Sequence, residues 1–147
     1  MKVIAITSVG GHWVQLLRLL PAFEGMEVVF VSTVKSLSTT VSGNKFYYIP
    51  DASRWNKLKL LQTFFKALKI VQKEKPNVII TTGAAPGLLT LIAGKILGSK
   101  TIWIDSVANA EKLSLSGRIA LRIADKTYTQ WPDLAGHRII YAGNILS

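Results

Sequence analysis

The residue types best suited to chemistry come early in the chain, in a short loop that ends Gly10-Gly11-His12. An apolar run that stops at paired glycines and turns into a helix leaves backbone N–H groups free, and phosphate and other oxyanions bind there. Ser8 adds a hydroxyl group to this loop. The loop lacks the G-x-G-x-x-G fingerprint and the Lys-Ser/Thr pair of a P-loop, so it predicts neither cofactor. His12 favours sugar-nucleotide or lipid-phosphate chemistry; the alternative is a tight turn with a capping histidine.

A second glycine-containing loop occupies residues 81–89, with the sequence TTGAAPGLL. Gly83 and Gly87 would let a ligand approach the backbone closely, because glycine carries no side chain. Pro86 fits the first position of a helix, where its missing N–H has no partner to lose. Small residues also serve tight helix–sheet packing, which is the alternative. Two such loops side by side favour a ligand-binding cleft more than either loop would alone.

Polar residues also follow a third apolar run, in the sequence TIWIDSVAN. Asp105, Ser106 and Asn109 supply a carboxylate, a hydroxyl and an amide there. Ligands of parallel sheets bind at the carboxyl ends of the strands. We therefore expect this loop to converge with the two glycine-containing loops on one cleft.

The segment LSLSGR combines helix-capping and basic side chains. Ser114 or Ser116 can accept a hydrogen bond from the first turn of the helix that follows. Arg118 and Arg122 would lie one turn apart on that helix and could bind a phosphate or an acidic partner. Solvent exposure is the simpler alternative for each arginine taken alone.

These loops must be positioned by the apolar runs around them. Short, almost continuous apolar runs separated by helical patterns are typical of a parallel sheet covered on both faces. We expect one α/β domain over residues 1–147, a Rossmann-like doubly wound parallel sheet. The expected strands are 2–8, 27–32, 45–50, 77–83, 101–107, 126–131 and 138–143, and the expected helices are 12–23, 34–41 (weak), 54–75, 86–97 and 116–124.

Composition excludes several classes of protein. Of the 147 residues, 49% are hydrophobic and 18% charged, an ordinary balance for a globular domain. Cysteine is absent, which excludes disulfides and thiolate chemistry, and the spacing of His, Asp and Glu resembles no metal site. No apolar run is long enough for a signal peptide or a membrane span, so a soluble or peripheral protein is expected. The net charge of +10 predicts an anionic partner.

The expected helix over residues 54–75 is both basic and amphipathic. Its large apolar side chains recur on one stripe, expected to be core, and lysines recur every seven residues on another. The stripe consists of Trp55, Leu58, Leu61, Phe64, Phe65, Leu68 and Val71, and the lysines are Lys59, Lys66 and Lys73. Leu60 and Ile70 lie off the apolar stripe and are expected to add exposed apolar surface. An ordinary surface helix explains most of the pattern, but apolar bulk flanked by basic residues also suits an anionic bilayer. The expected membrane-contact residues are Trp55, Lys59, Phe64, Phe65 and Lys66.

Several segments together resemble a known family. SVGGHWVQLLRL, TTGAAPG, WIDSVANAEKLSLSGR and IADKTYTQWPDL occur in this order and are followed by YAGN. They resemble the acceptor-side subunit of two-chain glycosyltransferases, a group that includes the membrane-anchoring subunit of the eukaryotic UDP-N-acetylglucosamine transferase of dolichol-linked oligosaccharide synthesis. The bacterial PssD/CpsF proteins of capsule and exopolysaccharide synthesis are similar. The resemblance covers nearly the whole chain.

The resemblance implies the N-terminal half of a GT-B glycosyltransferase, similar to MurG divided into two chains. This half would bind a polyprenyl-diphosphate-linked sugar acceptor at the cytoplasmic face of an anionic membrane, as a peripheral protein without a transmembrane helix. A partner chain would supply the donor-binding half and hold the UDP-sugar, so no cofactor and no metal are expected here. Asp105 stands where the family usually has Glu, and residues 107–109 depart from its usual aromatic-plus-arginine pattern.

The family's reaction needs a base that takes the proton from the acceptor hydroxyl as UDP leaves. His12 is the first candidate, since imidazole exchanges protons near neutral pH. Asp105 is the second, either as base or as orienter of the acceptor sugar. The expected substrate-binding residues are Ser8, Gly10, Gly11, Gly83, Pro86, Gly87, Ser106, Asn109, Ser116 and Arg118.

Two alternatives remain open at this point. A stand-alone Rossmann-type module would bind a nucleotide, but no acidic residue follows the second strand to bind a ribose hydroxyl. Nucleic acid is not expected, because no aromatic–basic strand platform is present. A scaffold that only recruits the catalytic partner differs from the first hypothesis only in whether His12 and Asp105 take part in the chemistry.

Overall fold

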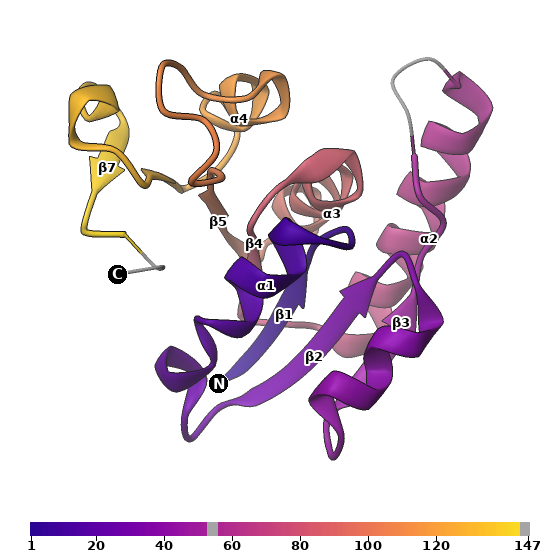
Figure 1. Ribbon diagram of the computed structural model, residues 1–147. Helices are drawn as coiled ribbons and strands as arrows, with labels where there is room; N and C mark the ends of the chain where they lie inside the picture. The colour runs from indigo at the N-terminus through magenta and orange to yellow at the C-terminus, as the bar shows by residue number, and fades with distance from the viewer. Residues whose placement is uncertain (53–55, 145–147) are drawn as a thin grey trace.

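The sheet of this protein has seven parallel strands in the order β3-β2-β1-β4-β5-β6-β7 (Figure 1). The computed structural model describes residues 1–52 and 56–144. The strands are β1 (Lys2–Ile6), β2 (Glu27–Ser32), β3 (Lys45–Tyr48), β4 (Val78–Thr81), β5 (Lys100–Ile104), β6 (Lys126–Thr129) and β7 (Ile139–Tyr141). The helices are α1 (Gly11–Leu17), η1 (Leu20–Phe23), η2 (Lys35–Val41), α2 (Lys57–Glu74), α3 (Ala84–Ile96), α4 (Leu115–Ala120) and η3 (Pro132–Leu134), where η marks a 3₁₀ helix.

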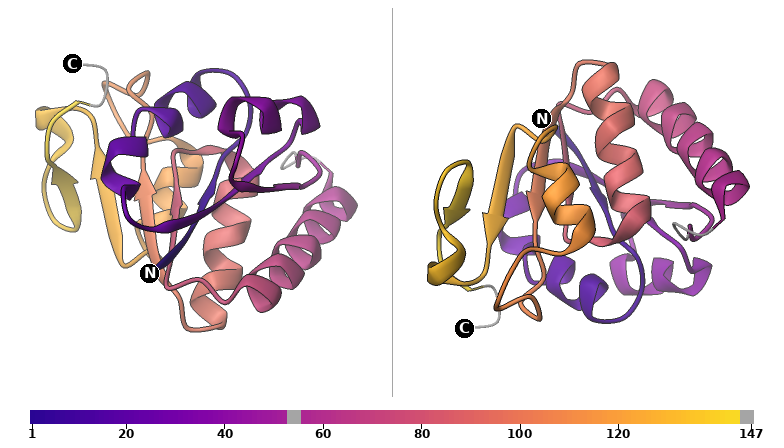
Figure 2. Two further views of the ribbon diagram at one scale, coloured as in Figure 1. Left: turned by 90° about the horizontal axis from the view of Figure 1, so that it is seen from below. Right: turned by 90° about the horizontal axis from the view of Figure 1, so that it is seen from above.

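Helices cover both faces of the sheet, as the doubly wound prediction requires (Figure 2). The helices α2, α3 and α4 pack on one face, and α1, η1 and η2 pack on the other. The central strand β1 is buried on both sides: Ile4 and Ile6 belong to the first core, Val3 and Ala5 to the second. All seven expected strands are present, because such continuous apolar runs suit strands that are covered on both faces.

Three expected helices differ in the structure, and one of them, expected over 116–124, already ends at Ala120 as α4. The pattern over residues 12–23 predicts one helix, but α1 stops early and the short helix η1 follows after a break. Pro21 has no N–H to donate, and its ring would clash with a carbonyl one turn earlier. The weak helix expected over 34–41 is the 3₁₀ helix η2. There Thr39 and Thr40 donate to carbonyls three residues earlier, a local bond that competes with α-helical geometry.

The buried face of α2 matches the stripe that the sequence suggested only in part: Val71 is in the core and Phe64 and Leu68 pack against it, but other members of the stripe are exposed. Ala67 and Ile70 are 1% and 5% exposed, whereas Leu58, Leu61 and Phe65 are 75%, 51% and 55% exposed. The expectation that Ile70 adds exposed surface is therefore wrong. Both rows of apolar residues recur at helical spacing, so periodicity alone cannot show which of them meets the sheet and α3.

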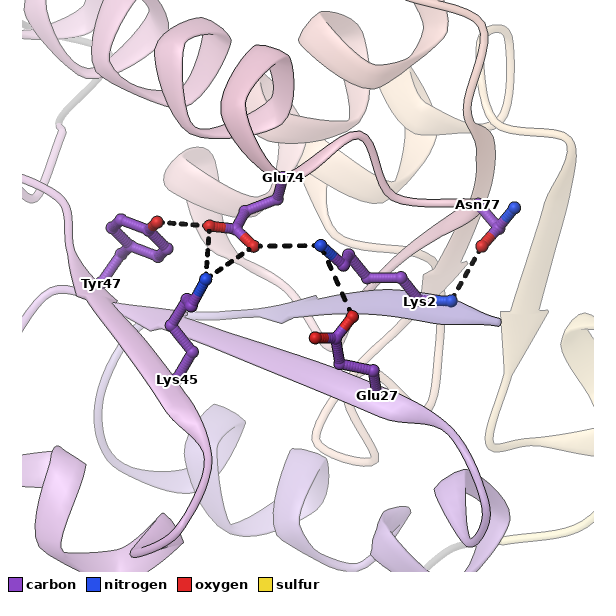
Figure 3. Close-up of polar contacts among 6 residues, drawn as sticks. All are labelled: Lys2, Glu27, Lys45, Tyr47, Glu74 and Asn77. Carbon is purple, nitrogen blue, oxygen red and sulfur yellow. Dashed lines mark hydrogen bonds and ion pairs between the residues drawn. The ribbon is translucent and has the colours of Figure 1, made fainter.

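A buried carboxylate, Glu74, joins the end of α2 to the starts of β1 and β3 (Figure 3). Its side chain is 2% exposed and contacts the ammonium groups of Lys2 at 3.3 Å and Lys45 at 3.2 Å. The Tyr47 hydroxyl also donates to Glu74. Lys2 contacts Glu27 at 3.4 Å on its other side. These five residues, the Glu74 cluster, tie α2 and the strands β1, β2 and β3 together at the amino-terminal edge of the sheet.

The charges of the Glu74 cluster make the fold sensitive to acid. Burial raises the pKa of Glu74, but hydrogen bonds from Tyr47, Lys45 and Lys2 outweigh burial, and the pKa is lowered overall. Burial and the bond to Glu74 raise the pKa of Tyr47 to about 12. A carboxylate whose folded pKa is lowered adds stability above its unfolded pKa. That contribution is lost as the pH falls through the folded pKa.

We expect Glu74→Gln to lower the free energy of unfolding by about 2 kcal/mol at neutral pH, because it weakens several hydrogen bonds to a buried charge. The difference from wild type should shrink in acid, where wild-type Glu74 is itself protonated. Urea unfolding near neutral pH and in acid measures both effects. Glu27→Gln is the matched control: its side chain is 65% exposed, so a loss below about 0.5 kcal/mol is expected. Equal losses in both variants would contradict the role given to Glu74.

Candidate functional site

A cleft of about 580 Å³ lies at the carboxyl ends of the central strands, a size typical of small-molecule sites. The loops after β4 and β5 contribute to its lining, as expected, but of the expected Ser8–His12 loop only His12, at the start of α1, lines the cleft. The helices α2, α3 and α4 supply the rest. The residues that line it are His12, Leu60, Gly83, Ala84, Ala85, Leu88, Leu89, Asp105, Ser106, Ala108, Asn109, Ser114, Leu115, Ser116 and Ile119.

The His12 ring is held across the gap between β1 and β4 by Thr82. Nδ1 of His12 lies 3.1 Å from the Thr82 carbonyl oxygen, and the Thr82 hydroxyl donates to the His12 carbonyl at 2.7 Å. A carbonyl oxygen only accepts, so Nδ1 carries the proton of the neutral ring and Nε2 keeps its lone pair. His12 is half-buried in the cleft lining. The geometry suits a base that acts through Nε2.

The backbone after β4 is shaped to admit this ring. A Cβ atom on Gly83 would lie 2.7 Å from both Cε1 and Nδ1 of His12, and the φ of Gly83 is 138°. Ala84, which follows, has a φ of 70°, a left-handed conformation that costs an L-residue about 1 kcal/mol or more. Such strain is typical of functional sites. The helix α3 begins at Ala84, so Pro86 lies slightly inside its first turn and not at its first position.

Asp105 is 1% exposed and accepts four hydrogen bonds. Its Oδ1 accepts from Trp103 Nε1 at 2.9 Å and from Ser114 Oγ at 2.7 Å. Its Oδ2 accepts from Asn109 Nδ2 at 3.1 Å and from the Ser114 backbone N–H at 3.0 Å. Ser114 also caps α4 by accepting from Gly117 N–H at 2.9 Å. Because both carboxylate oxygens are occupied, the geometry favours Asp105 as an organiser of the cleft wall over a base.

The remaining lining of the cleft is largely apolar. Among the described lining residues, His12 and Asp105 are the only ionisable side chains. Nowhere in residues 1–52 and 56–144 do three or more His, Asp or Glu side chains gather closely enough to hold a metal ion. A cleft with polar groups on one part and apolar walls on another suits an amphiphilic ligand. The large apolar side chains are Leu60, Leu88, Leu89, Leu115 and Ile119.

The structure brings only part of the expected site together. Ser8 and Gly10 lie in the loop after β1 and Gly11 begins α1, and all three are outside the cleft lining. The expected residues that do line the cleft are His12, Gly83, Asp105, Ser106, Asn109 and Ser116.

Two other expectations are corrected. Pro86 and Gly87 are buried in α3, and a Cβ on Gly87 would meet the Thr81 hydroxyl oxygen at 2.1 Å. Gly87 therefore serves helix–sheet packing and does not admit a ligand. Arg118 is exposed and does not line the cleft; with Arg122 it lines a neighbouring hollow on the outer side of α4 that shares Leu115 and Ile119 with the cleft.

Three side chains that support the cleft are absent from the sequence-based expectations: Gln15, Thr82 and Trp103. Gln15 is 3% exposed in α1. An amide within the apolar pattern HWVQLL is a signal that could have revealed it, because buried polar groups need partners. Thr82 and Trp103 follow the ordinary composition of buried strands, so their pattern gives no such signal.

The expected membrane-contact residues of α2 do not all share one face. Lys59 and Phe65 are exposed. Phe64 is half-buried and packs against the core beneath the helix, so its assignment to a membrane contact is corrected. Trp55 lies outside the described residues.

Four further side chains of α2 are Lys66, Leu60, Leu58 and Leu61, and their surroundings differ. The Lys66 ammonium lies 4.9 Å from the centre of the Tyr48 ring, a cation–π contact that directs it toward β3. Leu60 lines the cleft, whereas Leu58 and Leu61, expected in the core, are exposed. In the part of the chain that the structure describes, no helix combines the length and apolarity needed to cross a membrane.

The sequence is similar to proteins of known classes. A model of the family described as "Oligosaccharide biosynthesis protein Alg14 like" matches residues 54–145. UDP-N-acetylglucosamine transferase subunit ALG14 of Yarrowia lipolytica is 30% identical over 162 residues, which cover 91% of this chain and 75% of the relative. A Staphylococcus aureus UDP-N-acetylglucosamine–N-acetylmuramyl-(pentapeptide) pyrophosphoryl-undecaprenol N-acetylglucosamine transferase is 27% identical, over 90% of this chain and 42% of its own length.

The fold is similar to that of a solved transferase. The crystal structure of MurG from Acinetobacter baumannii matches with a TM-score of 0.79 and 15% identity, over 96% of this chain and 45% of MurG. At this identity the likeness shows the fold alone. The chain thus spans less than half the length of MurG and of the staphylococcal transferase.

We expect Gly117→Ala to lower the free energy of unfolding by about 2 kcal/mol, the usual cost of overpacking. Its Cβ would lie 2.5 Å from Asp105 Oδ1 and 3.0 Å from Ser114 Oγ, so the carboxylate and the cap of α4 must move apart. Gly136→Ala is the matched control, because its Cβ would meet nothing within 4 Å. Thermal unfolding of both variants measures the difference. A Gly117→Ala protein as stable as the control would contradict the close packing of α4 on Asp105.

Proposed function

Because the chain belongs to the family of Alg14-like oligosaccharide biosynthesis proteins, we propose that it is the acceptor-side subunit of a two-chain, UDP-sugar-dependent glycosyltransferase. In this proposal it binds a polyprenyl-diphosphate-linked sugar and recruits a donor-binding subunit to the cytoplasmic face of the membrane. The Yarrowia relative is named as a transferase subunit, which supports an activity that needs a second chain. Capsule, exopolysaccharide or lipid-linked oligosaccharide synthesis is the proposed setting.

The observation that carries the proposal is the amphipathic cleft. Its polar part holds an imidazole whose Nε2 is available, and its apolar part is built from large side chains of α2, α3 and α4. A lipid-linked sugar would fit such a cleft, because its hydroxyl-rich sugar matches the polar part and its apolar chain matches the apolar part. A nucleotide-binding module would need no such apolar walls.

The proposed mechanism starts at the acceptor hydroxyl. His12 Nε2 takes the proton from this hydroxyl as its oxygen attacks the anomeric carbon of the donor sugar and UDP leaves. The bond from Nδ1 to the Thr82 carbonyl fixes the ring and stabilises the imidazolium that forms. Asp105 holds Asn109 and the start of α4 in place and so orients the acceptor sugar. Ser106, Asn109 and Ser116 supply polar groups for the sugar.

In this proposal the acceptor diphosphate and the UDP-sugar donor bind at the rim of the cleft. Gly10 and Gly11 are exposed beside the cleft lining, and their backbone would face the acceptor diphosphate or the donor phosphates. The UDP-sugar would be held mainly by the partner chain, so this chain needs no cofactor of its own. A donor domain closing over the carboxyl edge of the sheet would exclude water from the reaction.

Membrane contact is assigned to the outer face of α2. Leu58, Leu61 and Phe65 are exposed there, with Lys59 nearby on the same half of the helix. Apolar side chains with flanking lysines bind an anionic bilayer through both burial and charge. The net charge of +10 acts in the same direction.

The direct experiment is purification of the tagged chain from detergent-solubilised membranes of its own cells, followed by a transfer assay. The probes are radiolabelled UDP-N-acetylglucosamine and a polyprenyl-diphosphate-linked sugar. We expect a second, donor-binding chain in near-equal amount and sugar transfer by the complex. Recovery of the chain alone, without transfer activity, would overturn the proposal.

We expect His12→Ala to lower kcat of this complex by about 10²–10⁴-fold, the usual contribution of a general base. The fold should persist, since His12 is only half-buried and its ring makes one hydrogen bond. His137→Ala is the matched control, because His137 is exposed and lies outside the cleft lining. Activity of His12→Ala within a few-fold of wild type would remove His12 from the chemistry and favour a recruiting scaffold.

We expect the triple variant Leu58→Ser/Leu61→Ser/Phe65→Ser to bind phosphatidylglycerol-containing vesicles at least about tenfold more weakly than wild type, because it removes apolar surface from the bilayer contact. Vesicle co-sedimentation measures the binding. The matched control is Ile96→Ser/Leu97→Ser at the end of α3, where the side chains are 65% and 41% exposed at the opposite edge of the sheet. Equal binding by the two variants would contradict the assignment to α2.

A further inference from the structure

Gln15 lies in α1, one turn after His12, and both ends of its side-chain amide are used. It is 3% exposed. Its Nε2 donates to Ser106 Oγ at 3.1 Å, and its Oε1 accepts from the Val107 backbone N–H at 3.3 Å. One side chain thus links the helix that carries His12 to the loop after β5, which forms the polar part of the cleft.

The orientation of this amide follows from its partners. The Val107 N–H can only donate, so the Gln15 oxygen must face it and the Gln15 nitrogen must face Ser106. Ser106 Oγ also accepts from Ala108 N–H at 3.2 Å. On its other side the loop is held by Trp131, whose Nε1 donates to the Val107 carbonyl at 2.7 Å. Gln15 thus links this loop to α1, whereas Trp131 links it to the segment that follows β6.

We infer that Gln15 is a positioning residue, which sets the place of Ser106 and Val107 relative to His12 and thereby the binding of the acceptor. The inference rests on the proposed function. The base and the sugar-binding loop stand on different elements, α1 and the end of β5, so their separation is set by side-chain contacts between them. Displacing one of two such groups by about an ångström is enough to weaken productive binding strongly.

Gln15→Leu tests this role, because leucine keeps most of the bulk and removes both hydrogen bonds. In the complex with its donor-binding partner, the KM for the polyprenyl-linked acceptor should rise about tenfold or more, while the KM for the UDP-sugar stays within about twofold. Gln15→Glu should keep the acceptor KM near the wild-type value. Its carboxylate can accept from both the Val107 N–H and the Ser106 hydroxyl, although burying a charge there lowers thermal stability.

Thr101→Val is the matched control for a lost buried hydrogen bond. Thr101 is fully buried at the far end of β5, where its hydroxyl donates to Asp125. We expect this variant to melt at a lower temperature without a change in the acceptor KM. An NMR measurement of amide exchange at Val107 gives a readout apart from activity: exchange should be faster in Gln15→Leu and unchanged in Thr101→Val.

The outcomes separate this inference from the proposed function. A wild-type complex that transfers no sugar overturns the proposed function, and exchange at Val107 then still decides whether Gln15 holds the loop. An active wild type whose acceptor KM is unchanged in Gln15→Leu overturns the inference alone. An equal rise of the acceptor KM in Gln15→Leu and Gln15→Glu also overturns it, since Glu retains both contacts.

Discussion

The cleft depends on one constraint of topology, the adjacency of β1 and β4 in a parallel sheet. The chain leaves β1 toward α1 on one face and leaves β4 toward α3 on the other, so the two loops diverge and open a crevice at the carboxyl edge. His12 and Thr82 close part of this gap with two hydrogen bonds. A base candidate therefore sits at the position where a doubly wound sheet must open, and the fold alone explains why it is there.

The two edges of the sheet carry different features: the amino-terminal edge holds the ion pairs of Glu74, and the carboxyl edge holds the cleft. At the amino-terminal edge, the buried carboxylate of Glu74 joins α2, β1 and β3 and is fully hydrogen-bonded. At the carboxyl edge, Ala84 stays in a left-handed conformation and Gly83 lies against the His12 ring. Backbone strain persists only where the surrounding structure fixes it. Tight packing of α3 on β4, which Gly87 permits, supplies this fixation next to the strained residues.

The sequence predicted the sheet well because strands covered on both faces leave an unambiguous apolar pattern. It also placed His12 and the loops after β4 and β5 at one cleft, since their position follows from parallel topology. The sequence did not predict the buried face of α2 correctly, because this helix carries two rows of apolar residues. Only packing against α3 decides which row is buried. The sequence failed again at Gly87, because close approach to a ligand and close approach to Thr81 require the same residue. The Gln15 contact joins residues 91 positions apart, which no local pattern reveals.

The apolar part of the cleft continues onto the outside of the molecule. Leu60 lines the cleft from α2, and its neighbour Leu61 is 51% exposed on the outer side of the same turn. On the other flank, Leu115 and Ile119 of α4 line the cleft and are themselves 44% and 45% exposed. Large exposed apolar patches mark sites that a partner, a ligand or a membrane covers. A ligand with a long apolar chain could extend from the cleft onto these side chains, and on the α4 flank Arg118 and Arg122 lie beside them. The proposed acceptor site and the proposed bilayer contact thus lie next to each other on α2, through Leu60 and Leu61, and the separate tests of cleft and outer face decide each of them.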